Sequence, residues 1–318
     1  MTSLDKTSPE LSIVIVNYNT GDFLSGTLNA LINHPPSVPW ETIILDNGSS
    51  DHSVETARKS VGDDSHFRFV QSDTNLGFAA GNNHAISQSS GKYILLLNPD
   101  TAVTNNALDS LINYLKSNNS VGAVGAKLVD SNGDPTVSFG SFPTLTGILA
   151  GAFLPKRIQG TKSGGLGIAP EQSMKEPLEV DYVSGACLMT SAEIWNKVGP
   201  LDEGYFAYFE ETDWCLRLKK LGFKVILLPS TTVYHFEGRS FTEIPYKKME
   251  IFVTSAKRFF KLHYPPGMCV YYITVNSIAS FLKIYYLTIT GLFSKPRRER
   301  TSSVLAHHKA FLKALMKL

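Results

Sequence analysis

The chain has 318 residues, 43% of them hydrophobic, and a formal net charge of +2. This length fits one large domain or one domain with an appended segment, and so small a charge gives no reason to expect a nucleic-acid partner. The three cysteines, Cys187, Cys215 and Cys269, lie far apart. They form neither a disulfide framework nor a zinc-binding spacing, which is typical of proteins in a reducing cytoplasm.

Short apolar runs alternate with helical patterns through the first half of the chain. The predicted strands are 11–16, 42–45, 67–70 and 93–97, and the predicted helices are 22–32, 53–60, 78–88 and 107–115. Four such repeats indicate an α/β fold, with a mainly parallel sheet and helices on both of its faces. The polar residues 1–10 contain no apolar core, so we expect no secretory signal peptide.

The pattern becomes less regular after residue 120. We expect a hairpin turn at 130–134, because Asn-Gly is a strong turn signal and the glutamate of a calcium-binding EF-hand loop is missing. Residues 140–177 are rich in Gly, Pro, Ser and Lys, which predicts a long loop that acts as a lid or is a disordered insert. The remaining predicted strands are 121–129, 180–189, 224–228 and 231–234, and the remaining predicted helices are 191–198 and 210–221.

The C-terminal part is predicted to be helical and to contact a membrane. Residues 247–263 form an amphipathic pattern with basic residues on the polar side. Residues 268–293 are almost wholly apolar and long enough to span a bilayer, although Lys283 interrupts them; a buried hairpin and an interfacial helix are the alternatives. A basic group follows, which favours an anionic membrane surface. It consists of Lys295, Arg297, Arg298 and Arg300.

Polar residues follow each of the first four predicted strands. Ligands of open α/β sheets bind beyond the carboxyl ends of the strands, so these residues are candidates for one site. They are Asn17 and Tyr18, then Asp46, then Asn75, Gly77 and Asn82, and finally Asn98 and Asp100. No glycine-rich dinucleotide loop or P-loop is present, which argues against a dehydrogenase or a P-loop kinase. Asp46 suits a nucleobase or ribose, and Asp100 a divalent cation, although each alone is also an ordinary turn residue.

The helix predicted at 210–221 begins with three carboxylates. The helix dipole and an i,i+4 ion pair with Arg217 account for Asp213. They do not account for the adjacent Glu210 and Glu211, which follow the aromatic run 205–209. A carboxylate beside apolar rings has a raised pKa and can serve as a general base, and such rings are suited to lining a sugar site. His235 ends a predicted strand, where a lone histidine is more often structural than a metal ligand.

These segments resemble glycosyltransferase family 2, and within it the bacterial rhamnosyltransferase-like branch. The similar motifs occur in the family's order between about residues 11 and 236. They are Ile15-Val-Asn-Tyr-Asn19, Leu45-Asp-Asn-Gly-Ser-Ser-Asp51, Asn75-Leu-Gly-Phe-Ala-Ala-Gly-Asn82, Leu97-Asn-Pro-Asp100, Ser184-Gly-Ala-Cys187, Val198-Gly-Pro-Leu-Asp202, Phe209-Glu-Glu-Thr-Asp-Trp-Cys-Leu-Arg217 and Val233-Tyr-His-Phe236. One such motif would be weak evidence, whereas the ordered set is specific.

The resemblance implies a GT-A fold, a nucleotide-sugar donor and Mg2+ or Mn2+ as cofactor. It implies a catalytic domain over residues 1–245, with a nucleotide-binding half at 11–130 and an acceptor half at 131–245, before a membrane-associating segment at 246–318. Asp100 and His235 fall where the family binds the metal, and Asn98 replaces the first acid of the family's Asp-x-Asp motif. Glu211 takes the place of the catalytic base, with Glu210 as the alternative. The residues implied to bind the nucleotide sugar are Asn17, Tyr18, Asp46, Asn75, Gly77, Asn82, Asn98 and Gly185.

The implied activity is inverting transfer of a sugar, in this branch L-rhamnose from dTDP-L-rhamnose, to a polysaccharide or lipid-linked acceptor at the cytoplasmic face of a membrane. UDP-linked hexoses or galactofuranose are alternative donors. Two other classes are a sugar-nucleotide nucleotidyltransferase and a non-catalytic carbohydrate-binding relative. The first predicts a glycine-rich segment with arginine and lysine after the first strand, where Asn17-Tyr-Asn19 stands; the second predicts loss of Asp100, Glu211 or His235.

Overall fold

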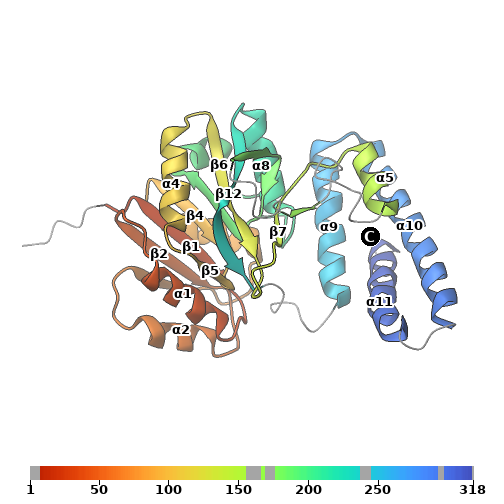
Figure 1. The fold of residues 1–318 in the computed structure, drawn as a ribbon, viewed down its shortest axis with the longest axis horizontal. Helices are drawn as coiled ribbons and strands as arrows, with labels where there is room; N and C mark the ends of the chain where they lie inside the picture. The colour runs from red at the N-terminus through yellow and green to blue at the C-terminus, as the bar shows by residue number, and fades with distance from the viewer. Residues whose placement is uncertain (1–7, 155–165, 169–175, 237–244, 293–296, 317–318) are drawn as a thin grey trace, which may run out of the picture. The chain divides into compact units, whose positions relative to one another are not determined.

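The computed structural model describes residues 8–154, 166–168, 176–236, 245–292 and 297–316 (Figure 1). The chain divides into two compact units. The first comprises Met1–Gly140, Leu166–Glu203 and Glu210–Ser240, and the second comprises Ser141–Gly165, Gly204–Phe209 and Phe241–Leu318. The two units are described separately below.

A nine-stranded sheet forms the centre of the first unit. Its strands are β1 (Leu11–Asn17), β2 (Trp40–Asp46), β3 (Phe67–Gln71), β4 (Tyr93–Leu97), β5 (Thr101–Val103), β6 (Val121–Val129), β9 (Leu178–Val180), β11 (Cys187–Ser191) and β12 (Lys224–His235). The order is β3-β2-β1-β4-β11-β6-β12-β5, and β9 pairs with β12. The first four strands are parallel, as are β6 and β12, whereas β5, β9 and β11 pair antiparallel with their neighbours. The predicted mainly parallel α/β sheet is therefore confirmed.

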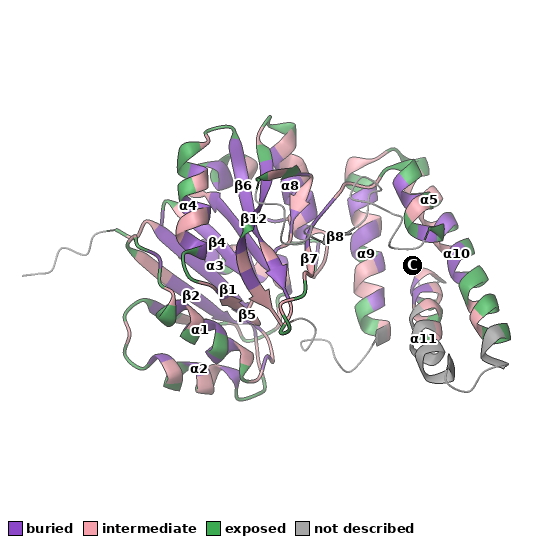
Figure 2. Cartoon of the chain, viewed as in Figure 1, coloured by how far each residue is buried: buried purple, intermediate pink, exposed green. Residues whose placement is uncertain are grey.

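Helices cover both faces of this sheet, and its apolar strands are therefore buried on both sides (Figure 2). Ile13 and Ile15 of β1 point to the face that carries α1, α2 and α4, whereas Val14 and Val16 point to the face that carries α3, α7 and α8. These helices are α1 (Phe23–Asn33), α2 (Ser53–Val61), α3 (Phe78–Ile86), α4 (Ala107–Ser117), α7 (Ala192–Val198) and α8 (Glu210–Lys220). The alternation of side chains along a strand thus builds two apolar layers from one continuous apolar run.

The prediction that 140–177 is only a loop was wrong. It contains helix α5 (Leu145–Phe153) and strand β8 (Leu166–Ile168), and its residues 155–165 and 169–175 lie outside the described part of the chain. Helix α5 forms because the Thr144 side chain accepts a hydrogen bond from the Gly147 amide, and because Ile148 and Ala152 are buried. Strand β8 pairs with β7 (Val137–Gly140), which also pairs with β10 (Tyr182–Val183).

Three smaller expectations also needed correction or were refined. The strands predicted at 224–228 and 231–234 are one strand, β12, whose register shifts between Leu228 and Thr232. The turn at 130–134 is present, with Gly133 in the left-handed region (φ 84°). Strand β7 after it belongs to a separate three-stranded sheet, in which it lies between β10 and β8. The helix predicted at 210–221 ends at Lys220, and Leu221 after it is 53% exposed.

The second unit is helical. It contains α5, α9 (Pro245–His263), α10 (Pro266–Leu292) and α11 (Arg297–Met316). Because α10 is one continuous helix, the alternative of a buried hairpin was wrong. Among the described residues, one helix has the length and apolarity to cross a bilayer, at Pro266–Ile289, and only 22% of its apolar window is buried. The side chains of the basic group at 295–300 lie outside the described residues.

Candidate active site

The polar residues of the sequence motifs meet at one edge of the sheet in the first unit. Parallel β1 and β2 end together, with Asn17 opposite Asp46 in register. The antiparallel strand β11 begins at this same edge, since Cys187 pairs with Leu97 at the end of β4. The register therefore brings residues 184–186, which precede β11, next to the segment 98–100 that follows β4.

Asp100 and His235 form a close pair at this edge. His235 is the last residue of β12 and pairs with Thr101 at the start of β5, and the Phe236 amide donates to the Asp100 carbonyl at 2.9 Å. This pairing places His235 Nε2 3.4 Å from Asp100 Oδ1, with the two side chains 11% and 13% exposed. The side-chain nitrogen Nδ2 of Asn98 lies 3.3 Å from the same Nε2 atom.

This pair fits a divalent cation that is shared with a diphosphate. No cluster of three or more His, Cys, Asp or Glu side chains suited to a metal occurs within the described ranges. The protein therefore offers one carboxylate and one imidazole, and the Asn98 Oδ1 atom beside them is buried without a hydrogen-bond partner among the described residues. Mg2+ and Mn2+ accept such ligands and complete their coordination with phosphate oxygens and water.

Asp46 is the last residue of β2, and the loop that follows binds its side chain. Its side chain is 7% exposed, and Oδ1 accepts a hydrogen bond from the Ser49 amide at 3.0 Å. Asn17 stabilises the same loop, because its amide donates to the Ser49 hydroxyl at 3.1 Å and to the Ser53 hydroxyl at 2.9 Å. The Asn17 side chain is thus used to shape the loop, while Asp46 retains an oxygen for a ligand. Tyr18 is partly exposed.

The segment before α3 is organised by Asn47, which the sequence analysis did not single out. The Asn47 amide donates to Asn75 Oδ1 at 3.0 Å and to the Gly77 carbonyl at 3.1 Å, and Asn47 Oδ1 accepts from the Leu76 amide. Gly77 has a φ of 85°, a left-handed conformation that favours glycine. The Asn82 side chain is buried and donates to the Phe78 carbonyl at 2.9 Å, so its amide nitrogen is used within α3.

Glu210 and Glu211 begin helix α8, as the sequence predicts, and the Asp213–Arg217 ion pair forms at 2.8 Å. Burial raises the pKa of Glu211 to about 7. Burial, together with the neighbouring Glu211 charge, raises the pKa of Glu210 well above its usual range. Glu210 is 5% exposed and its Oε2 atom has no hydrogen-bond partner among the described residues. At neutral pH Glu211 therefore exchanges a proton readily, and burial together with the Glu211 charge disfavours the ionisation of Glu210 beside it.

Gly185 connects Glu211 to the Asp100–His235 pair. An ideal Cβ at Gly185 would lie 3.7 Å from Cβ of Glu211 and 3.3 Å from Cζ of Phe78. The backbone carbonyl of the next residue, Ala186, accepts a hydrogen bond from the backbone amide of Asn98 at 3.1 Å. The segment 185–186 thus lies near the Glu211 side chain and is hydrogen-bonded to Asn98, which lies beside His235.

Two aromatic residues at this site were missed by sequence reasoning. The Phe78 ring lies against Gly185, and Tyr182 is hydrogen-bonded to the Thr212 side chain. Burial and the Glu211 charge both raise the pKa of Tyr182, so its phenol stays neutral. In the sequence, Phe78 is marked only by its place within the motif 75–82, and Tyr182 only by its place just before the motif 184–187. In the aromatic run 205–209, Tyr205 is fully buried and Phe206 is 39% exposed.

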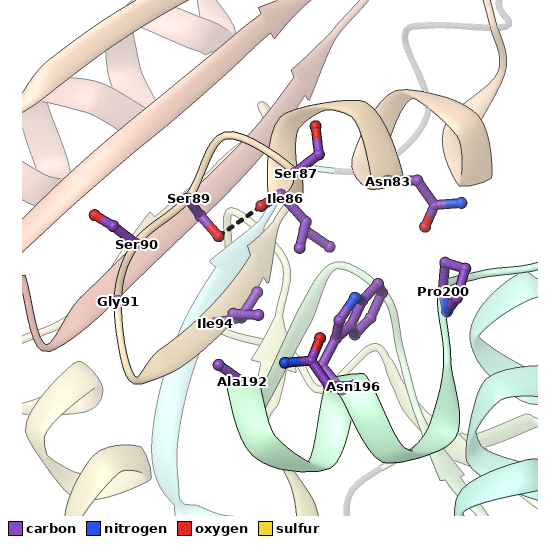
Figure 3. Close-up of a pocket in the computed structure, with 11 residues that line it drawn as sticks. Asn83, Ile86, Ser87, Ser89, Ser90, Gly91, Ile94, Ala192, Asn196 and Pro200 are labelled. Carbon is purple, nitrogen blue, oxygen red and sulfur yellow. Dashed lines mark hydrogen bonds between the residues drawn. The ribbon is translucent and has the colours of Figure 1, made fainter.

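A pocket of about 430 Å3 lies elsewhere in the first unit (Figure 3). Ile94, near the beginning of β4, lines it together with Ala192 and Asn196 of α7. The candidate residue Asn98 follows the opposite end of β4. None of the predicted site residues lines this pocket, which therefore is separate from the Asp100–His235 pair and Glu211.

The chain is similar in sequence to known glycosyltransferases. Residues 12–168 match the family model described as "Glycosyl transferase family 2". The chain is 29% identical over 247 residues to an N-acetylglucosaminyl-diphospho-decaprenol L-rhamnosyltransferase of Mycobacterium tuberculosis, a match that covers 72% of this chain and 77% of the relative. It is 25% identical over 232 residues to the rhamnosyltransferase WbbL of Escherichia coli, covering 63% of this chain and 85% of that protein.

Solved structures show the same fold. The mannosyltransferase PcManGT of Pyrobaculum calidifontis, in complex with GDP-Man and Mn2+, matches with a TM-score of 0.59 at 14% identity over 98% of this chain and 87% of that one. GalNAc-T7 with UDP, GalNAc and Mn2+ matches with a TM-score of 0.58 at 13% identity over 86% of this chain, which spans 55% of that protein. These likenesses establish a GT-A fold. The chain belongs to glycosyltransferase family 2 and is a glycosyltransferase that transfers a sugar.

Proposed function

We propose that this glycosyltransferase inverts the transferred sugar, and that it moves L-rhamnose from dTDP-L-rhamnose to a hydroxyl of a polysaccharide or lipid-linked acceptor. The observation that carries the proposal is the convergence at one sheet edge of Glu211, Gly185 and the Asp100–His235 pair. In this proposal Glu211 is the base and the Asp100–His235 pair is the cation site, and a single displacement at a sugar diphosphate needs both near the reacting atoms.

Glu211 is the base in this proposal. Its raised pKa lets it accept the proton of the acceptor hydroxyl at neutral pH. The acceptor oxygen forms a bond to the anomeric carbon as the bond from that carbon to the diphosphate oxygen breaks on the opposite face, which inverts the configuration. No covalent sugar–enzyme intermediate is needed, so one carboxylate is sufficient. Burial and the Glu211 charge disfavour a second negative charge on the neighbouring Glu210.

Asp100 and His235 would hold the divalent cation, Mg2+ or Mn2+, with Asn98 beside them. When bound, such a cation neutralises the charge that develops on the leaving diphosphate. Asp46, with its remaining carboxylate oxygen, would accept hydrogen bonds from the base or ribose of the donor. The residues of the loops before α3 and β11 would surround the sugar.

The acceptor side is proposed to work at a membrane surface. Helix α10 contains no Asp or Glu, and it exposes Val270, Phe281 and Tyr285 at 64%, 62% and 68%. In the same unit α5 exposes Leu145 and Phe153, and the Tyr271 hydroxyl of α10 donates to the Leu145 carbonyl at 3.1 Å. In this proposal the exposed apolar side chains of these two helices form one apolar face that binds the interface of a bilayer. A lipid-linked acceptor would be available there.

A donor panel tests the proposal. Purified enzyme, Mn2+ and a lipid-linked saccharide acceptor are mixed in turn with dTDP-L-rhamnose, UDP-hexoses and UDP-galactofuranose, and the released nucleoside diphosphate is measured. We expect the highest turnover with dTDP-L-rhamnose, and a loss of roughly 100-fold or more in kcat for Glu211→Gln with donor KM retained. Higher turnover with a UDP-linked sugar would refute the donor assignment, and an active Glu211→Gln enzyme would refute the base.

A further inference from the structure

The segment Gly204–Phe209, which runs directly into Glu210, is held along its length by α9. All of these contacts lie within the second unit. The Ser255 hydroxyl of α9, 3% exposed, donates to the Ala207 carbonyl at 2.7 Å. The Phe252 ring centroid lies 5.8 Å from that of Tyr208 and 5.4 Å from that of Phe209.

The contacts continue one turn further along α9. The Arg258 guanidinium lies over the Tyr205 ring, 5.5 Å from its centroid, and the Phe259 ring centroid lies 5.3 Å from that of Phe209. Gly204 is small enough to leave space for the same guanidinium, since a Cβ there would overlap it. Residues 255, 258 and 259 follow 252 and 255 at spacings of three or four, so all four lie in one stripe on a single face of the helix.

The end of this segment is strained. Tyr208 and Phe209 have φ values of 68° and 71°, and both therefore adopt the left-handed conformation. Bulky aromatic residues rarely adopt it, because their Cβ atoms meet the backbone. Two successive residues of this kind persist only where surrounding contacts overcome the cost. The rings of both residues contact Phe252, and the carbonyl just before them is the one that Ser255 binds.

We propose that this stripe of α9, with Ser255 at its centre, is a positioning element that holds the strained turn and thereby sets the direction in which the chain enters α8, placing Glu211 toward the acceptor hydroxyl. The inference rests on the proposed function, in which Glu211 is the base. Glu211 follows Phe209 by two residues in the first turn of α8, so the backbone of Phe209 leads directly into the turn that carries Glu211.

A merely structural role for the stripe makes a different prediction. Loss of one packing contact would then lower the unfolding temperature or the fraction of active enzyme, without separating kcat from KM. A positioning role predicts a fall in kcat at unchanged donor KM, because the residues that face the donor belong to the sheet edge of the first unit.

Ser255→Ala removes one hydroxyl and leaves the helix intact, since alanine favours helices. Thr254→Ala is the matched control: it removes the neighbouring hydroxyl, which is exposed and donates only to the Glu250 carbonyl of its own helix. We expect kcat to fall about tenfold in Ser255→Ala. Donor KM, the affinity for nucleoside diphosphate with Mn2+, and the unfolding temperature should stay near those of Thr254→Ala.

Phe252→Leu provides a second test, because it removes the ring that contacts both strained residues. The same selective fall in kcat is expected. The inference is overturned if kcat in Ser255→Ala and Phe252→Leu equals that of the control, or if KM and kcat change together in proportion to unfolding. Glu211→Gln is measured in parallel: if it stays active, the base assignment fails, whereas an inactive Glu211→Gln with a fully active Ser255→Ala defeats only the positioning role.

Discussion

His235 Nε2 lies 3.4 Å from Asp100 Oδ1, although the two residues come from β12 and from the segment between β4 and β5. The antiparallel pairing of β12 with β5 brings them together. A carboxylate and an imidazole at this separation can bind the same cation.

This pair predicts a metal-dependent gain in stability. Nucleoside diphosphate with Mn2+ should raise the unfolding temperature of the wild-type protein, and chelator should remove most of the gain. Asp100→Asn and His235→Ala should each weaken Mn2+-dependent binding roughly tenfold or more. His66→Ala is the control, since His66 pairs with Asp64 at 2.7 Å just before β3, away from the site. Equal Mn2+-dependent shifts in all variants would contradict the metal assignment.

The raised pKa of Glu211 predicts the pH dependence of turnover. The base works only when ionised, and burial raises its pKa to about 7. The kcat/KM value should therefore fall as the pH drops below about 7 and level off above it, with the apparent pKa belonging to the Glu210–Glu211 pair. Initial rates measured from about pH 5 to about pH 9 check this. A profile that is flat down to about pH 5 would mean that the base is a carboxylate with an ordinary pKa.

Gly185→Ala tests the close contact between Glu211 and the loop before β11. The added methyl would lie 3.3 Å from the Phe78 ring and 3.7 Å from Cβ of Glu211, so the ring must move. We expect kcat/KM to fall about tenfold, through displacement of the base, with a small effect on unfolding temperature. Gly26→Ala, in α1 with no atom within 4 Å of the new Cβ, should retain full activity. An equally active Gly185→Ala enzyme would show that this contact does not position the base.

The apolar face of α5 and α10 predicts binding to membranes. The wild-type protein should sediment with anionic vesicles, and Phe281→Glu or Tyr285→Glu should reduce the bound fraction strongly, because each places a charge on an exposed apolar position. Leu221→Glu is the matched control, since Leu221 is similarly exposed at the end of α8 in the first unit. Sedimentation that is unaffected by all three changes would exclude this face as the binding surface.

The regular parts of the fold could be predicted from sequence because each has a local cause. The apolar run 11–16 predicts a buried strand, and the helical pattern at 107–115 predicts one of the helices that cover the sheet. Helix α5 was missed, because its small and apolar residues resemble a flexible loop until α10 provides a surface for Ile148. The strained turn at Tyr208 and Phe209 could not be foreseen, since neither residue type favours a left-handed backbone.

The candidate site shows the same difference between local and long-range causes. Asp46 and Asn98 follow strands directly, so the edge on which they lie follows from the parallel order of the sheet. Asn47 and Phe78 act through partners in other segments, Asn75 and Gly185, which no local pattern identifies. The pairing of β12 with β5, which places His235, likewise depends on residues that are far apart in the chain.

Strand β11 has a consequence for how substrates enter. It forms antiparallel ladders with β4 on one side and β6 on the other. Moving β4 away from β6 would break a row of buried backbone hydrogen bonds on one flank of β11. Access must therefore depend on the loops around a rigid platform. Under the proposed function, we expect an exchange of those loops between relatives to change which sugar is accepted while the ladders of β11 stay intact.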